Sequence, residues 1–371
     1  MKRKKMPSVD EETLIPLLLS LWRRLHKLPG PSDRLQTREF RSVVEAIRLM
    51  QAGQGGNLVE KNFLGASLLY YWWVYYQEGL SLLQEVPSSF RKVLDISGGL
   101  GPFSFAALKH GAEDVLAVDL NPQGLAFAKE IAGKYGFVLR TLVQDPRRST
   151  PAGSFDLVIA AHCQEKMFST LEERVVWVES LAAKLHPSGH LLLVESSLQE
   201  SNQPFLALRD VLVERGFPVQ APCVWKGVCP ARQSQTPCYA QREFVKPYLI
   251  QELQRGAEIR LSSLKMSYLL LKPKTAVWSD PPKALYRVIS PPLEGLFGRH
   301  FYLCGTDGKK SLSSALTETP PGAKAFDFLK RGELLSVEGV QERGNRLELT
   351  EESRIQIEAA LGKPYTSSTS L

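Results

Sequence analysis

The sequence predicts an α/β protein with a parallel, Rossmann-like sheet, a helical N-terminal leader and a small β-rich C-terminal module. Two patterns carry this prediction. Apolar residues recur at helical spacing from about Ile15 to Glu85, whereas short apolar runs alternate with helical stretches between Arg91 and Leu271, as in βαβ units. After Pro273 the chain holds several prolines and short strand-like runs, which indicate the β-rich module.

The expected domain boundaries follow these changes of pattern. We expect a helical region over residues 1–90, a sheet domain over 91–272 with a cysteine-bearing insertion at 220–262, and the β-rich module over 273–371. The sheet strands are expected at Lys92–Ile96, Val115–Val118, Val138–Leu142, Leu157–Ala160 and Leu191–Glu195, followed by a split hairpin of Val219–Pro222 and Lys265–Leu271. The module strands are expected at Phe301–Cys304, Glu333–Val337 and Arg346–Leu349.

Composition limits the possible functions. The 371 residues carry a net charge of +7, and 43% of them are hydrophobic, which excludes wholesale disorder. No apolar run reaches the ~18 residues of a membrane helix, so we expect no membrane association.

The positive charge, with basic clusters such as Lys2–Lys5, favours a polyanionic partner such as nucleic acid. The aromatic run Tyr70–Tyr76 is interpreted as packing rather than as a surface for RNA bases. Five cysteines in a chain of this length predict a reducing compartment, the cytoplasm.

A glycine-rich turn follows the first predicted strand. Asp95-Ile96-Ser97-Gly98-Gly99-Leu100-Gly101 ends an apolar strand and opens a helix, where glycines let a ligand approach the backbone and the helix N-terminus offers N–H groups. Asp119 ends the next strand, where a carboxylate can accept ribose hydroxyls, and Asp145 follows the third, where it can meet an adenine amine. A nicotinamide site or a ligand-free sheet remains the alternative.

The spacing D-x-S-G-G-x-G resembles motif I of the class I S-adenosylmethionine-dependent methyltransferases, with Ser97 in place of the first glycine. This resemblance implies a class I methyltransferase fold and a binding site for S-adenosylmethionine made of Asp95, Ser97, Gly98, Gly99, Gly101, Asp119 and Asp145. No catalytic residue is assigned, because Ala160–Gln164 lacks the N/D-P-P-Y/F turn of base amino methylation. We interpret Cys163 as a buried thiol and His162 as a wall of the pocket.

Four cysteines, Cys223, Cys229, Cys238 and Cys304, form a second candidate site. Their gaps of five, eight and sixty-five residues are poor for a zinc ribbon. An iron-sulfur cluster suits irregular spacing in a proline- and glycine-containing loop better. Spacing alone leaves a cluster, zinc and unlinked cysteines open.

The residues around these cysteines resemble one particular family. They include Cys223-Val224-Trp225-Lys226-Gly227-Val228-Cys229-Pro230, Pro237-Cys238 and Leu303-Cys304-Gly305-Thr306-Asp307-Gly308. Together they are similar to the methyltransferase-like mitochondrial small-ribosomal-subunit assembly factors and their bacterial homologues. The resemblance implies a 4Fe-4S cluster on the four cysteines, with zinc as the alternative metal. It also implies a protein that binds the small ribosomal subunit and its rRNA. Separately, we expect a monomer. Such a protein would either methylate rRNA or act as a non-catalytic assembly factor.

Overall fold

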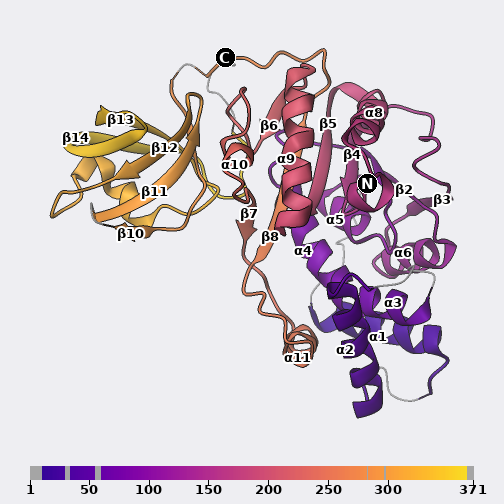
Figure 1. The fold of residues 1–371 in the computed structure, drawn as a ribbon. Coiled ribbons are helices and arrows are strands. Elements are labelled where there is room, and N and C mark those ends of the chain that lie inside the picture. Colours follow the sequence, from indigo (N-terminus) through magenta and orange to yellow (C-terminus); the bar gives the residue numbers. More distant parts are fainter. Residues whose placement is uncertain (1–10, 30–33, 55–59, 282, 296–297, 366–371) are drawn as a thin grey trace, which may run out of the picture. The chain divides into compact units, whose positions relative to one another are not determined.

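The structure is a computed structural model that describes residues 11–29, 34–54, 60–281, 283–295 and 298–365 (Figure 1). The basic cluster Lys2–Lys5 and the tail from Thr366 lie outside the described residues. The chain forms two compact units. Unit 1 comprises Met1–Leu83, Phe90–Pro151 and Glu243–Leu264; unit 2 comprises Gln84–Ser89, Ala152–Arg242 and Lys265–Leu371. Among the described helices, none combines the length and the apolar character that a membrane crossing needs.

The main sheet has the strand order β3-β2-β1-β4-β5-β8-β6, with β7 paired to β8. The strands are β1 (Lys92–Ile96), β2 (Asp114–Asp119), β3 (Leu139–Val143), β4 (Phe155–Ala161), β5 (Leu185–Ser196), β6 (Val219–Ala221), β7 (Ala240–Arg242) and β8 (Leu264–Leu271). In unit 1, β1 is parallel to β2 and β2 to β3. In unit 2, β4 is parallel to β5, and β8 runs antiparallel to both β5 and β6. The predicted α/β, methyltransferase-type sheet and its split hairpin are confirmed.

Unit 1 also contains the predicted helical leader. Its helices are α1 (Glu11–His26), α2 (Thr37–Gln51), α3 (Lys61–Ala66), η1 (Ser67–Tyr71) and α4 (Trp72–Leu83), with α5 (Pro102–His110), α6 (Pro122–Lys134) and α11 (Tyr248–Gly256). A buried ion pair between Arg23 and Glu39 (2.8 Å) joins α1 to α2. Tyr70, Trp72 and Trp73 are at most 3% exposed, so the aromatic run packs inside the unit as predicted.

The helices of the part of unit 2 before the C-terminal module lie between β4 and β7 in the sequence. These are α7 (Gln164–Met167), α8 (Leu171–Ala182), α9 (Gln199–Glu214) and α10 (Pro230–Gln233). Helix α9 packs against β5 and α8, and the short α10 packs against α9 (Figure 1). This packing places α9 beside the insertion that holds three of the four cysteines.

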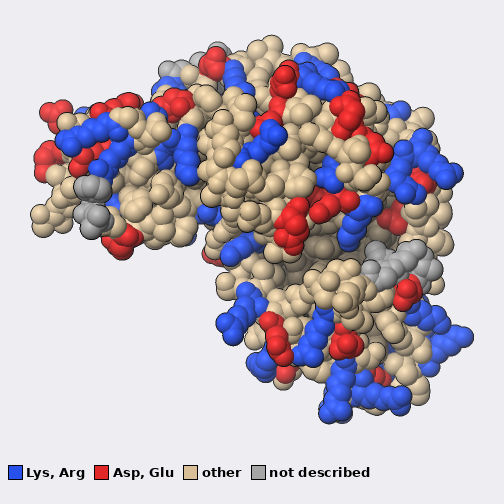
Figure 2. Space-filling view, viewed as in Figure 1, with Lys and Arg blue, Asp and Glu red and all other residues tan. Residues whose placement is uncertain are grey.

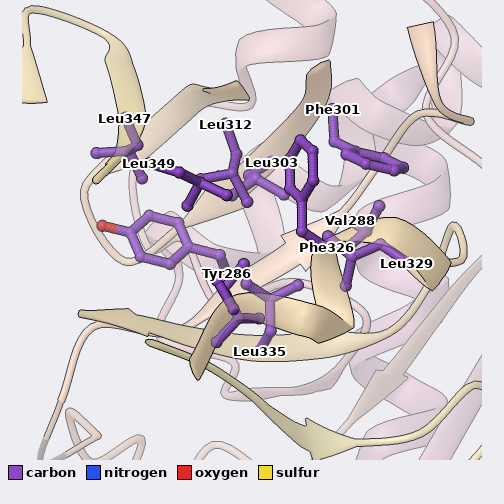
Figure 3. Packing of buried hydrophobic residues seen from close by; sticks show 12 residues of the cluster. Tyr286, Val288, Phe301, Leu303, Leu312, Phe326, Leu329, Leu335, Leu347 and Leu349 are labelled. Atoms are coloured by element: carbon purple, nitrogen blue, oxygen red, sulfur yellow. The ribbon is translucent and has the colours of Figure 1, made fainter. Parts of the chain in front are cut away.

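The C-terminal part of unit 2 is a separate six-stranded sheet, which confirms the predicted β-rich module. Its strands are β9 (Tyr286–Val288), β10 (Leu293–Gly295), β11 (Gly298–Gly305), β12 (Gly308–Ser313), β13 (Leu334–Arg343) and β14 (Arg346–Ala359), with helix η2 (Pro321–Phe328) before β13. The order is β10-β11-β12-β14-β13-β9, and β9 also pairs with β11. Phe301, Leu303, Leu312 and Leu335 point into one shared core (Figure 3).

Candidate functional site

The glycine-rich turn is a tight structure between β1 and α5. The Gly101 N–H donates to the carbonyl of Gly98 (2.6 Å), and the indole N–H of Trp72 donates to the carbonyl of Leu100 (3.0 Å). Gly101 has φ +73°, and a Cβ there would lie 2.7 Å from the Cβ of Ala128 on α6. Glycine is therefore required at this position both by conformation and by helix packing.

The backbone at Gly99 is open and faces the carboxylate of Asp119. A Cβ at Gly99 would meet only Oδ2 of Asp119, at 3.8 Å. The Gly99 N–H donates to Oδ2 (3.0 Å) and the Asn121 N–H to Oδ1 (2.8 Å), so the carboxylate is fixed and keeps further lone pairs for a ligand. Burial raises the pKa of Asp119, while the hydrogen bonds from Asn121 and Gly99 counteract that rise. An open glycine beside a fixed, partly exposed carboxylate fits the ribose of a nucleoside cofactor.

Asp95 has a different role from Asp119. Its side chain is only 2% exposed and accepts a hydrogen bond from the hydroxyl of Ser104 (2.5 Å). A Cβ at Gly98 would lie 3.1 Å from its Oδ2, so the carboxyl group lies directly beneath the turn. Burial raises the pKa of Asp95 to about 7. This residue supports the shape of the turn from below.

Asp145 is engaged by two arginines. Its Oδ1 accepts from the backbone N–H and Nε of Arg147 (3.0 Å each), its Oδ2 accepts from Nη2 of Arg147 (2.8 Å), and Arg148 lies 3.5 Å from Oδ2. The hydrogen bond from Arg147 lowers the pKa of Asp145 to about 2. A contact with an adenine amine would have to compete with these ion pairs.

Ser97 occupies a backbone conformation that favours glycine. Its φ is +62°, in the left-handed region, where an L side chain costs about 1–2 kcal/mol. The structure thus explains why related motifs have glycine at this position: the constraint at Ser97 is conformational.

Replacing Ser97 with glycine should stabilise the protein. Relief of the left-handed strain is partly offset by glycine's loss of conformational entropy, about 0.5–1 kcal/mol, so we expect a net gain of about 0.5–1 kcal/mol in the free energy of unfolding. Urea unfolding of Ser97→Gly and Ser97→Ala measures it, because alanine keeps the Cβ and should bring no gain. A glycine variant no more stable than the alanine variant would refute this account.

The carboxyl ends of β4 and β5 hold a buried polar group in unit 2. His162 follows β4 with φ +54°, and Cys163 is 4% exposed, as predicted for a buried thiol. The N–H of Gln164 donates to Oε1 of Glu195 (2.8 Å), which is itself 6% exposed and whose pKa burial raises. Both polar side-chain atoms of Gln164 are buried without a hydrogen-bond partner among the described residues.

The structure places the four predicted cysteines near enough to one another for their charges to interact. Burial raises the pKa values of Cys229, Cys238 and Cys304, that of Cys304 to about 12. Every pair among these three thiols and Cys223 is close enough for negative charge on one to raise the pKa of another. Among the described residues, no three His, Cys, Asp or Glu side chains are placed to hold a single metal ion.

Basic side chains surround the thiols. Arg209 and Arg287 counteract part of the rise in the pKa of Cys304, and Arg331 counteracts part of the rise in that of Cys238. The Nε of Arg209, and the Nε and Nη1 of Arg331, are buried without a partner among the described residues. Thiols with unsatisfied guanidinium donors nearby have the ligand chemistry of an anionic thiolate-bound cluster, although the described residues do not place three such ligands around one metal ion.

Comparison with known proteins identifies the family. A family described as "Mitochondrial small ribosomal subunit Rsm22" matches residues 81–323, more than half of the chain. The chain belongs to the Rsm22 family. The match spans the glycine-rich turn, all four cysteines and the start of the C-terminal module, so both candidate sites lie inside the Rsm22 region.

Curated relatives cover a smaller part of this Rsm22-family chain. Ribosomal protein L11 methyltransferase of Geobacter metallireducens is 35% identical over 101 residues, which are 27% of this chain and 31% of the relative. The enzyme of the same name from Geobacter sulfurreducens is 33% identical over 126 residues, 34% of this chain and 36% of the relative. The chain thus spans about a third of the length of these relatives.

The solved structures that the chain matches have low sequence identity to it. The plantazolicin methyltransferase BpumL covers 68% of this chain and 99% of its own length, with a TM-score of 0.39 and 10% identity. A ribosomal protein L11 methylase from Lactobacillus delbrueckii subsp. bulgaricus covers 54% of this chain and 76% of its own, with a TM-score of 0.34 and 16% identity.

Sequence reasoning missed the side chains of α9 that hold the cysteine loop of this Rsm22-family chain. Asn202 is fully buried; its Nδ2 donates to the carbonyl of Cys238 (2.8 Å), and its Oδ1 accepts the Cys238 N–H (3.2 Å). Asp210 accepts the Cys229 N–H at Oδ1 (3.0 Å), and Leu206 packs with Cys229 and Cys238. Arg209 donates to the carbonyls of Trp225 and Gly227. The signal was present: positions 202, 206, 209 and 210 lie on one face of a helix.

Proposed function

We propose that this chain acts on the small ribosomal subunit as an S-adenosylmethionine-dependent rRNA methyltransferase. The binding of S-adenosylmethionine is proposed from one observation, the open backbone of Gly99 beside the fixed carboxylate of Asp119. S-adenosylmethionine supplies an electrophilic methyl group. Asp119 would hold the ribose hydroxyls, while the turn from Ser97 to Gly101, shaped by Asp95 beneath it, would carry the rest of the cofactor. Membership of the Rsm22 family supports the small subunit as the partner.

The polar group of unit 2 supports a role in transfer. A buried amide normally finds hydrogen-bond partners, and that of Gln164 has none among the described residues. We propose that Gln164 binds the methyl acceptor and that Glu195 positions it through the backbone of Gln164. The left-handed conformation of the adjacent His162 is the kind of local strain that gathers at functional sites.

A second candidate function is that of a non-catalytic assembly factor, which binds the subunit and never turns over. The chain after β4 favours it, since Cys163 is buried and no N/D-P-P-Y/F turn is present in residues 160–164. The strained Ser97 in the cofactor turn points the same way.

We further propose a 4Fe-4S cluster on Cys223, Cys229, Cys238 and Cys304. The mutual influence of the four thiols and the arginine donors around them support it. Because Cys304 belongs to β11 and the other three to the insertion, the cluster would join the C-terminal module to the insertion within unit 2. No disulfide joins any of the five cysteines, which supports a reducing compartment. We place the protein in the cytoplasm, as a monomer.

Two measurements on one preparation test the function. Purified protein with methyl-labelled S-adenosylmethionine should label rRNA in small subunits that lack the modification, and tagged protein should sediment with small subunits in a sucrose gradient. Gln164→Ala should lose at least nine-tenths of the labelling rate and still co-sediment. Binding through phosphates should weaken steeply with salt, by a log-log slope of about 0.7–0.9 per phosphate contact.

The outcomes separate the candidates. Co-sedimentation without any label from the wild-type protein would support the assembly factor and reject the enzyme. Label in a ribosomal protein rather than in RNA would reject RNA as the acceptor. Sedimentation with the large subunit, or with no ribosomal particle at low salt, would reject the ribosomal role.

A further inference from the structure

The C-terminal module closes into a five-stranded barrel. Strand β9 pairs with β11, β11 with β12, β12 with β14, β14 with β13, and β13 returns to β9. Every pairing is antiparallel except that of β12 with β14. Numbered within the barrel, the order is 1-2-3-5-4-1, with a helix between the third and fourth strands. A closed five-stranded Greek-key barrel of this order is the oligonucleotide- and oligosaccharide-binding (OB) fold.

The interior of the module agrees with this assignment. Side chains from all five strands meet in one core, and Phe326 of η2 packs on Phe301 of β11 with ring centroids 5.3 Å apart at 84° (Figure 3). Helix η2, between the third and fourth strands in the sequence, therefore contributes Phe326 to the barrel core. In OB folds, the outer face of the second and third strands is the one that binds ligands. Here those strands are β11 and β12.

The outer face of β11 and β12 carries an exposed aromatic ring. Phe301 and Leu303 are buried in the barrel, so the alternating residues His300, Tyr302 and Cys304 lie on the other face. Tyr302 is 38% exposed, and the His300 ring lies 5.7 Å from it in an edge-on arrangement. An exposed aromatic ring on an OB strand is a candidate platform for base stacking.

One lysine lies over this ring, and one arginine lies on the same face of the barrel. Lys309 of β12 places Nζ 4.7 Å from the centroid of the Tyr302 ring. Arg346, at the start of β14, donates through Nε to the Ser313 hydroxyl (3.2 Å) and so lies along the same face. Lys and Arg are interleaved with Asp and Glu over the face of the module that Figure 2 shows, so the proposal rests on this local group of side chains.

We propose that the outer face of β11 and β12, together with Arg346, binds single-stranded RNA. Tyr302 would stack on a base, while Lys309 and Arg346 would contact the phosphates on either side of it. The positive charge beside the ring favours a nucleic acid over the uncharged oligosaccharides that other OB folds bind. This inference deepens the proposed function, since it names the part of the chain that holds the RNA and the form in which the RNA is bound.

Fluorescence anisotropy of the full chain with a labelled single-stranded RNA of about 12 nucleotides tests the proposal. Tyr302→Ala should raise the dissociation constant roughly 5- to 150-fold, the effect of losing one stacked base, while Tyr302→Phe keeps the ring and the affinity. Lys309→Ala should lower the slope of log affinity against log salt by about 0.7. Tyr248→Ala is the matched control, because Tyr248 is an exposed tyrosine of unit 1, far from the barrel in sequence.

Several results would overturn the proposal. These are unchanged binding by Tyr302→Ala, equal binding to a duplex of the same sequence, and displacement of the RNA by neutral oligosaccharides. Co-sedimentation with small subunits is scored separately. Loss of oligonucleotide binding in Tyr302→Ala, with no subunit association even in the wild-type protein, would uphold the RNA face and reject the ribosomal role. If the wild-type protein associates with small subunits, Tyr302→Ala does so equally well, and neither binds single-stranded RNA, the ribosomal role would stand and the RNA face would be rejected.

Discussion

Replacing Cys304 with alanine should remove nearly all the iron from the protein. Anaerobically purified wild-type protein is expected to be brown, with iron and acid-labile sulfide in equal amounts, and the variant to retain less than about a tenth of either, because a cluster needs all four thiolates. Metal binding is coupled to folding, so the same substitution should destabilise the insertion and the module more than the sheet strands of unit 1. Metal analysis and limited proteolysis measure the two effects.

The matched control is Cys163→Ala, which removes the fifth cysteine. Cys163 is more buried than the ligand candidates and lies just after β4, outside their group, so iron and sulfide should stay at the wild-type level. A wild-type protein that carries zinc and no sulfide would contradict the cluster and leave a four-cysteine zinc site. Equal loss of metal in both alanine variants would show that unfolding, rather than a missing ligand, causes the loss.

Asp119→Ala should weaken the binding of S-adenosylmethionine about ten- to hundredfold. The carboxylate is fixed by two backbone N–H groups, and a hydrogen-bonded contact from a charged group to the ribose diol is worth about 1.5–3 kcal/mol. Isothermal titration calorimetry measures the dissociation constant.

Asp114→Ala is the control for this experiment, because Asp114 begins the same strand and pairs with Arg140 at the surface (2.6 Å). Its affinity for the cofactor should equal that of the wild-type protein. No binding to the wild-type protein at millimolar ligand would contradict the cofactor proposal. Undiminished affinity in Asp119→Ala would contradict the ribose contact alone.

The sequence predicted those parts of the fold that depend on local pattern. Strands β1, β2 and β4 are continuous apolar runs, and the turn from Ser97 to Gly101 is marked by its glycines, so both could be located from the residues alone. The burial of Asp95 could not, since a carboxylate at the end of a strand has the same sequence pattern whether it faces a ligand or lies beneath the turn. The Ser104 hydroxyl that it accepts from lies nine residues away, on the following helix.

Long-range pairing explains what the sequence did not reveal. Strand β9 has only three residues, Tyr286–Val288, and no run of this length predicts a strand that closes a barrel with β11 and β13. The gathering of Cys304 with three cysteines of the insertion depends on that closure, because β9 and β11 hold Arg287 and Cys304 in register. Spacing along the chain carries none of this information, so the ligand set came from resemblance.

The contacts of helix α9 with the cysteine loop would affect how fast the site takes up iron and sulfide. The Asn202 side chain hydrogen-bonds to both the N–H and the carbonyl of Cys238, and the Asp210 carboxylate accepts the N–H of Cys229. Two of the four ligand positions are therefore fixed by protein contacts alone. The conformational entropy of ordering this loop is then lost during folding of the polypeptide and not at the moment of metal capture. We expect the metal-free chain to take up iron and sulfide at a rate limited by their supply, because the loop is already ordered. In Asn202→Ala, uptake should be slower, because the loop must first adopt the ligand geometry.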